Sequence, residues 1–189
     1  MSFIYVIAGK RGLGKTTLLK SLLENYESSN IIVFDYLSEY DIENFNIAFG
    51  LNEINQNILN KKDKYVKLIF RPNKEDNLTI EKSFDKICEI VLLSNNTIFI
   101  IEECDNFCSP YYLSEPFRQI IEYGRHQNIS IIATTRRLGN LNRSLTAQAN
   151  KLFTFRQTEK RDLEALNFLG LNINQVKDLD NFKYIEYDL

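Results

Sequence analysis

A glycine-rich segment near the amino terminus constrains the fold of this chain more than any other feature. Residues 9–16 read GKRGLGKT, which fits the G-x-x-x-x-G-K-[ST] pattern of a phosphate-binding loop at every position. The apolar run Ser2–Ala8 before it predicts a buried strand. Thr16–Asn25 after it predicts an amphipathic helix with its leucines on one face. A strand, a glycine turn and a helix in this order predict a βα unit built around an anion.

The chemistry of this loop assigns roles to its residues. Glycines let the backbone curl so that successive N–H groups point into one hollow, and the following helix adds its own unpaired N–H groups. Lys15 is expected to reach the β- and γ-phosphates, Thr16 to ligate Mg²⁺, and Thr17 to contact the α-phosphate. The predicted nucleotide-binding residues are Gly9, Lys10, Arg11, Gly12, Leu13, Gly14, Lys15, Thr16 and Thr17. The alternative is a glycine turn that binds nothing.

Strand-like and helix-like segments alternate along the rest of the 189 residues. Further strands are predicted at Asn30–Tyr36, Tyr65–Arg71, Thr97–Ile101, Ile129–Thr135 and Leu152–Arg156. Helices or helical turns are predicted at Leu51–Leu59, Leu78–Leu93, Glu115–His126, Ser144–Asn150 and Lys160–Leu169. This alternation predicts an α/β fold with a mainly parallel sheet, helices on both faces and ligands at the carboxyl ends of the strands. The length favours one domain over residues 1–189.

Two adjacent acids follow the predicted strand Thr97–Ile101. Neighbouring residues of a strand point to opposite faces, so Glu102 and Glu103 are expected to act differently at the point where the strand ends. By their order, Glu102 is assigned to Mg²⁺ and Glu103 to the base that deprotonates the attacking water, with Asp105 as a fallback metal ligand. A solvated acidic turn is the alternative.

Polar residues also end the predicted strand Ile129–Thr135. There a side chain could sense the γ-phosphate, and Thr135 is assigned this role, with Thr134 beside it. Arg136 and Arg137 follow at once. Plain loop residues would show the same pattern, so both interpretations stay open.

Composition and the weaker patterns exclude several classes. A net charge of −2 argues against a polybasic protein that binds nucleic acid over its whole surface, although a local cationic patch is allowed. No apolar run reaches the length of a membrane span. Residues 60–63, NKKD, match the guanine-reading pattern of GTPases but stand too early in the chain, without a switch motif before them. Cys104 and Cys108 are half of a zinc site without the other half, so reduced, buried thiols in a cytosolic protein are expected.

Four segments of the chain together resemble those of one protein family. The loop GKRGLGKT, the segment 32–40 with its Asp35 and Glu39-Tyr40, the IIEE strand and the segment 123–137 are similar to the HerA/FtsK superfamily of DNA-pumping P-loop ATPases. The chain departs from that pattern at Glu102, where Asp is usual, and at Asn128 and Thr135, which stand at a glycine and a glutamine.

The resemblance implies a RecA-like P-loop ATPase that uses ATP and Mg²⁺. It also implies a homo-oligomeric ring, commonly a hexamer, that moves double-stranded DNA, and the small size is most similar to viral genome-packaging ATPases. A neighbour's arginine would complete each site, with Arg125 preferred over Arg118 and Arg156. DNA would meet a pore loop with Arg136, Arg137 and Arg143. A capsid or membrane protein is a further expected partner, and the host cytoplasm or the virion the expected location.

Two other functions use the same features. A small P-loop kinase shares the loop and the size, but would want an arginine-rich lid and an acid that binds the acceptor. An assembly or secretion ATPase that acts on protein could use every feature described above.

Overall fold

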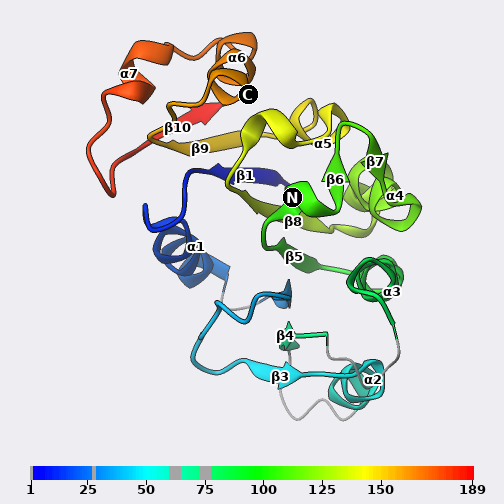
Figure 1. The fold of residues 1–189 in the computed structure, drawn as a ribbon. Helices are drawn as coiled ribbons and strands as arrows, with labels where there is room; N and C mark the ends of the chain where they lie inside the picture. Colours follow the sequence, from blue (N-terminus) through cyan, green and yellow to red (C-terminus); the bar gives the residue numbers. More distant parts are fainter. Residues whose placement is uncertain (1, 27–28, 60–64, 73–77) are drawn as a thin grey trace.

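The computed structural model describes residues 2–26, 29–59, 65–72 and 78–189. Its main element is an eight-stranded sheet in the order β10-β9-β1-β8-β5-β2-β4-β3 (Figure 1). All neighbouring pairs in this sheet are parallel except β10 with β9. The α/β fold with a mainly parallel sheet, predicted from the alternation of elements, is therefore confirmed.

The strands that occupy the middle of the sheet are mostly apolar and buried, because layers of side chains cover both of their faces. The strands of the main sheet are β1 (Ile4–Ala8), β2 (Asn30–Phe34), β3 (Asn46–Ala48), β4 (Lys67–Phe70), β5 (Thr97–Ile101), β8 (Ser130–Thr135), β9 (Lys151–Phe155) and β10 (Tyr184–Asp188). A small hairpin pairs β6 (Cys108–Ser109) with β7 (Tyr112–Leu113).

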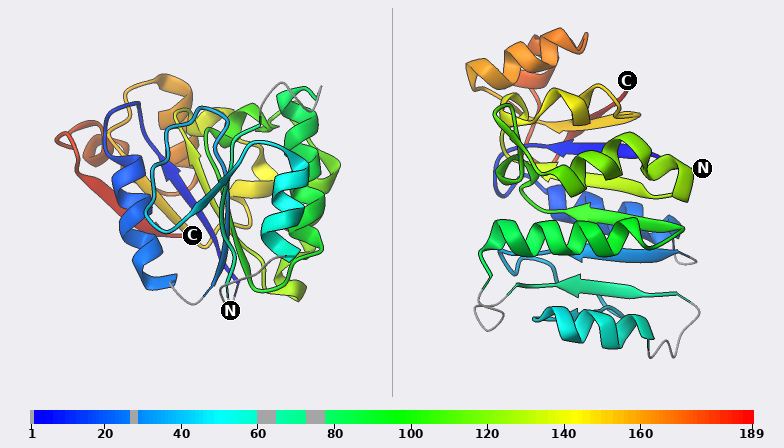
Figure 2. Two further views of the ribbon diagram at one scale, coloured as in Figure 1. Left: turned by 90° about the horizontal axis from the view of Figure 1, so that it is seen from below. Right: turned by 90° about the vertical axis from the view of Figure 1, so that its right-hand side faces the viewer.

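Helices cover the two faces unequally (Figure 2). The leucines of α1 pack on one face with Ile7, Val33 and Ile132, and the other helices contribute to the core on the opposite face. The helices are α1 (Lys15–Leu23), α2 (Leu51–Leu59), α3 (Ile80–Leu92), α4 (Glu115–Tyr123), α5 (Arg143–Thr146), α6 (Lys160–Phe168) and α7 (Ile173–Lys177). None of these helices is long and apolar enough to cross a membrane.

The register of the central strands sets the position of the site. Ala8, the last residue of β1, lies beside Thr135 of β8 and Thr154 of β9. Ile101, the last residue of β5, lies beside Phe34 of β2 and Ala133 of β8. The loops that follow β1, β2, β5 and β8 therefore leave the sheet at one edge, where an open parallel sheet binds its ligands.

Several elements were not predicted from the sequence. Strand β3 and the β6–β7 hairpin are only two or three residues long, too short for a periodic pattern. Strand β10 alternates exposed and half-buried residues at the edge of the sheet, and its partner β9 is far away in sequence. The guanine-like pattern at 60–63 lies outside the described residues.

Candidate active site

The loop between β1 and α1 has the backbone of an anion cradle. Gly12 and Gly14 have φ angles of 80° and 103°, in the left-handed region that favours glycine, and Gly14 caps the amino end of α1. The ammonium of Lys15 donates to the backbone oxygens of Gly9, at 2.9 Å, and Lys10, at 3.4 Å. The lysine is thus held over the loop, where the helix amino terminus also favours negative charge.

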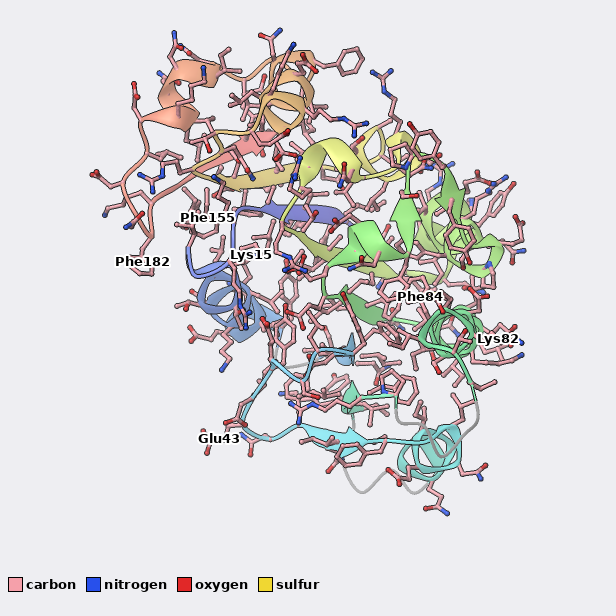
Figure 3. All side chains as sticks on the ribbon, viewed as in Figure 1. Lys15, Glu43, Lys82, Phe84, Phe155 and Phe182 are labelled. Atoms are coloured by element: carbon pink, nitrogen blue, oxygen red, sulfur yellow. The ribbon has the colours of Figure 1, made fainter. Side chains whose placement is uncertain are left out.

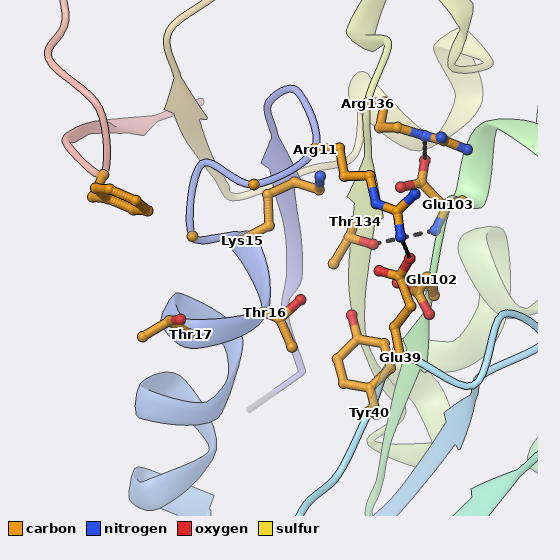
Figure 4. Close-up of a pocket in the computed structure, with 13 residues that line it drawn as sticks. Arg11, Lys15, Thr16, Thr17, Glu39, Tyr40, Glu102, Glu103, Thr134 and Arg136 are labelled. Carbon is orange, nitrogen blue, oxygen red and sulfur yellow. Dashed lines mark hydrogen bonds and ion pairs between the residues drawn. The ribbon is translucent and has the colours of Figure 1, made fainter.

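A cavity of about 340 Å³ opens beside this loop at the carboxyl edge of the sheet (Figure 4). It brings together charged and polar side chains from the ends of β1, β2, β5 and β8. The lining residues are Arg11, Gly12, Gly14, Lys15, Thr16, Thr17, Glu39, Tyr40, Glu102, Glu103, Thr134, Arg136 and Phe182. Among the residues predicted to bind nucleotide, Gly9, Lys10 and Leu13 are in the loop but not in this lining.

The two acids after β5 both face the cavity. Adjacent residues would diverge on a continued strand, but Glu103 has a φ of 45°, which turns the chain and brings its side chain back to the same side as Glu102. The Glu103 carboxylate pairs with Nε of Arg136 at 2.8 Å, and its backbone N–H donates to Oγ1 of Thr134 at 3.2 Å. Glu103 is only 4% exposed, and Arg136 holds its carboxylate while Thr134 holds its backbone.

Glu102 is suited to a cation. Its Oε2 is buried and has no hydrogen-bond partner among the described residues. Burial, followed by the nearby carboxylates of Asp35 and Glu39, raises the pKa of Glu102 to about 9. A divalent ion would supply the missing partner and favour the ionised carboxylate, and carboxylate and hydroxyl oxygens are the hard ligands that Mg²⁺ takes. The donors in this cavity therefore fit Mg²⁺.

Lys15 is electrostatically poised for an anion. Burial lowers the pKa of Lys15 below its usual value, and the charges of Glu103 and Glu102 oppose this shift. With Arg11 and Arg136, it gives the cavity three cationic side chains beside its carboxylates. Such a mixture suits a phosphate chain that arrives together with a metal ion.

Asp35 positions one wall of the cavity without lining it. Its buried carboxylate accepts hydrogen bonds from the backbone N–H groups of Glu39, at 2.9 Å, and Tyr40, at 3.1 Å, and pairs with Nε of Arg71 at 2.9 Å. Arg71 also donates to the backbone oxygen of Tyr40. Glu39 in turn pairs with Arg11 of the phosphate loop at 3.3 Å. The D-x-x-x-E-Y segment is thus a turn that places Glu39 and Tyr40 in the wall of the cavity.

The assignment of a phosphate sensor to Thr135 needs correction. Thr134 lines the cavity, whereas the Thr135 hydroxyl donates to Oδ1 of Asp105 at 2.8 Å. The alternation of β8 decides this, because the residue whose side chain faces the site is one position earlier than expected. Asp105, the fallback metal ligand, is likewise engaged with Thr135 and is not part of the lining.

The predicted DNA loop also differs from expectation. Arg136 lines the cavity and pairs with Glu103, while Arg137 pairs with Glu159 at 2.8 Å and with Asp162 at 3.0 Å. Both guanidinium groups are committed within the chain, because the turn after β8 lies against the site and against α6. The third arginine of that prediction, Arg143, lies over the Phe168 ring with Cζ 4.2 Å from the centroid.

Arg125 lies far from the cavity of its own chain. It belongs to the short 3₁₀ turn Gly124–Gln127 that precedes β8, so it is at the amino edge of the parallel sheet, with Ser2 and Ile4 lining the same hollow. Its action on a neighbouring subunit stays a prediction.

The cavity also contains residues to which the sequence assigned no role in nucleotide binding, namely Glu39, Tyr40, Arg136 and Phe182. The adjacency of Arg136 to the strand end was a usable signal for it, whereas nothing local marks Phe182.

All three cysteines are free and buried, and across the described ranges no group of three His, Cys, Asp or Glu side chains could hold a metal. A metal at this site would therefore share its coordination with phosphate and water.

Residues 2–152 match a family model described as AAA domain, which spans most of the chain. The chain belongs to the AAA domain family. It therefore contains a P-loop ATPase domain.

Solved structures with the same fold include viral packaging NTPases and VirB4. The genome packaging NTPase B204 from Sulfolobus turreted icosahedral virus 2, in complex with ATP-gammaS, has a TM-score of 0.77 at 21% identity, over 99% of this chain and 92% of that one. B204 from Sulfolobus turreted icosahedral virus, described as a DNA-packaging ATPase, has a TM-score of 0.71 at 21% identity, over 98% and 92%. VirB4 of Thermoanaerobacter pseudethanolicus has a TM-score of 0.61 at 12% identity, over 98% and 88%. No curated protein matches the sequence.

These likenesses establish the fold. Together with the family match, they confirm the predicted P-loop NTPase fold and the resemblance to P-loop ATPases.

Proposed function

We propose that this protein is a Mg²⁺-dependent ATPase that moves double-stranded DNA during the packaging of a viral or mobile-element genome. One observation carries the ATPase part: a single cavity collects Lys15 and Thr16 of the phosphate loop, Glu102 and Glu103 after β5, and Thr134 at the end of β8. The similarity to the packaging NTPases over nearly the whole of both chains supports the biological role.

The roles of the side chains follow from their chemistry. Lys15 binds the β- and γ-phosphates of ATP, and Thr16 and Glu102 hold the metal. When bound there, Mg²⁺ would supply positive charge that offsets the charge of the phosphate oxygens. Arg136, also in the lining, adds a second cation beside the terminal phosphate.

Glu103 acts as the general base. Its carboxylate accepts a proton from the attacking water, and Arg136 and Thr134 fix its direction through the contacts at 2.8 and 3.2 Å. Thr134, rather than Thr135, senses the terminal phosphate, because it joins the cavity to the backbone of Glu103.

Translocation requires more than one subunit. In our proposal the protein forms a ring, such as a hexamer, and contacts DNA through loops near Arg143, since Arg136 and Arg137 are committed within the chain. A few cations per subunit multiply around a ring, so a net charge of −2 does not oppose DNA binding. A capsid or membrane protein would dock this motor, in the host cytoplasm or the virion.

The test is the rate of ATP hydrolysis with and without duplex DNA. We expect phosphate release that depends on Mg²⁺, is lost in Lys15→Ala, and rises severalfold with long duplex DNA at low salt. If a protein stimulates hydrolysis and DNA does not, the result would favour an assembly or secretion ATPase. Transfer of phosphate to a small acceptor would show a kinase and contradict the proposal.

The role of Arg125 has its own test. If Arg125 completes a neighbour's site, mixing Arg125→Ala with Glu103→Gln subunits restores part of the hydrolysis that each variant lacks alone. The absence of any restoration in mixed oligomers of confirmed composition would contradict this role.

A further inference from the structure

An exposed aromatic ring from the carboxyl-terminal segment stands at the nucleotide cavity. Phe182 lies in the turn between α7 and β10, and it lines the same cavity as Thr17 and Lys15. The ring lies next to the phosphate loop: a Cβ atom on Gly14 would be 3.5 Å from Cδ1 of Phe182. Figure 3 shows Phe182 near Phe155 and Lys15. A residue more than 160 positions from the loop thus contributes to its binding site.

The conformation of Phe182 is unfavourable for an isolated residue. Its φ is 65°, a left-handed conformation that a bulky side chain rarely adopts. The side chain is also 69% exposed, although burial would stabilise it. Strained residues of this kind persist where the surroundings fix them, and they cluster at ligand sites.

The surroundings do fix this turn. Strand β10 pairs with β9 in a register that puts Tyr184 beside Phe155, with ring centroids 5.5 Å apart. Phe155 in turn packs against the phosphate loop, since a Cβ atom on Gly9 would be 2.7 Å from the Cβ atom of Phe155. The guanidinium of Arg156 donates to Oδ1 of Asn181 at 3.1 Å. Phe182 is therefore held at a set distance from the loop.

The cavity has two chemically different ends. Glu102, Glu103 and Arg136 lie on one side of Lys15, and Thr17 lies on the other (Figure 4). The first end is charged, and the end that Thr17 shares with Phe182 offers a hydroxyl and a flat apolar ring. A nucleoside triphosphate has the matching asymmetry, with anionic phosphates at one end and a flat aromatic base at the other.

We propose that Phe182 stacks on the base of the bound nucleotide, so that the turn between α7 and β10 is a purine subsite. This inference rests on the proposed ATPase function and adds to it the residue that recognises the base. Stacking is strongest for the larger rings and needs no hydrogen bond, so Phe182 favours purines over pyrimidines without separating adenine from guanine.

Calorimetric titration with two probes tests the subsite. ATPγS carries a base, whereas inorganic tripolyphosphate presents the anionic end alone. We expect Phe182→Ala to weaken ATPγS binding about tenfold and to leave tripolyphosphate binding unchanged. Phe182→Tyr keeps the ring and should bind ATPγS as the wild type does. Phe168→Ala is the matched control, because Phe168 is 70% exposed and lies away from this cavity.

The outcomes separate this inference from the proposed function. If the wild type binds ATPγS and Phe182→Ala binds it equally well, the subsite is refuted and the ATPase proposal stands. An equal loss for both probes in Phe182→Ala also refutes the subsite, because it shows damage to the phosphate loop. Failure of the wild type to bind ATPγS would overturn the ATPase proposal and the subsite together.

Discussion

Two buried aspartates of this fold each pair with an arginine and accept hydrogen bonds from the backbone. Asp35, after β2, accepts from Glu39 and Tyr40 and pairs with Arg71. Asp162, in α6, accepts from the backbone N–H of Gly139 at 2.9 Å and pairs with Arg137. Asp35 is 0% and Asp162 1% exposed, so both carboxylates depend on these partners.

The difference lies in what each aspartate holds. Asp35 fixes the turn that contains Glu39 and Tyr40, and these two residues form a wall of the cavity. Asp162, which does not line the cavity, fixes the turn after β8 to α6. In that turn Gly139 lies so close to α6 that a Cβ on it would be 2.8 Å from the backbone oxygen of Arg161. Nearly identical chemistry therefore supports the site in one place and the fold alone in the other.

The largest effect is expected when Asp35 loses its carboxylate. Asp35→Ala removes the carboxylate partner of Arg71, which keeps only its hydrogen bond to the backbone oxygen of Tyr40, and it leaves the N–H groups of Glu39 and Tyr40 unpaired. The free energy of unfolding should fall by about 3–5 kcal/mol, measured by urea denaturation. Asp35→Asn keeps the size and some acceptors, so it provides folded protein in which ATP affinity should also fall. A fall of less than about 1 kcal/mol in the unfolding free energy of Asp35→Ala would contradict the structural role given to Asp35.

The matching change at Asp162 should be smaller and confined to stability. Asp162→Ala frees one backbone N–H, but Arg137 keeps its contact with Glu159 at 2.8 Å. We expect the free energy of unfolding to fall by about 1–3 kcal/mol. The kcat and KM for ATP should match those of the wild type at a temperature where both are folded. A raised KM for ATP would show that this side also shapes the site.

The adjacent arginines provide the finest comparison. Arg136→Ala removes a cation from the cavity and the partner of Glu103, so kcat should fall about tenfold, or about 1.4 kcal/mol. Its unfolding free energy should change by less than about 1 kcal/mol, because the Arg136 side chain is 45% exposed. Arg137→Ala is the control and should affect unfolding but not kcat. The reverse pattern would exchange the roles of the two residues.

The parts of the molecule that follow from local pattern were predictable. A few consecutive residues are enough to identify the phosphate loop, the apolar strands and the acidic pair Glu102-Glu103. Because the carboxyl ends of parallel strands lie at one edge of the sheet, these segments were expected to meet there. The helix Leu51–Leu59 and the strand Thr97–Ile101 have the predicted bounds.

The remaining features depend on contacts that sequence does not express. The role of Asp35 needs Arg71, 36 positions later, and the place of Phe182 needs the pairing of β10 with β9. Thr134 and Thr135 are chemically alike, so only the orientation of β8 distinguishes them. The left-handed turn at Glu103 likewise follows from its surroundings rather than from its residue type.

The central claim is that this cavity hydrolyses ATP with Glu103 as the base. It is tested most directly by single-turnover hydrolysis and ATP binding in Glu103→Gln, which keeps the shape of the side chain. We predict an affinity for ATP within a few fold of the wild type and a hydrolysis rate at least about a hundredfold lower. Hydrolysis at the wild-type rate in this variant would contradict the account.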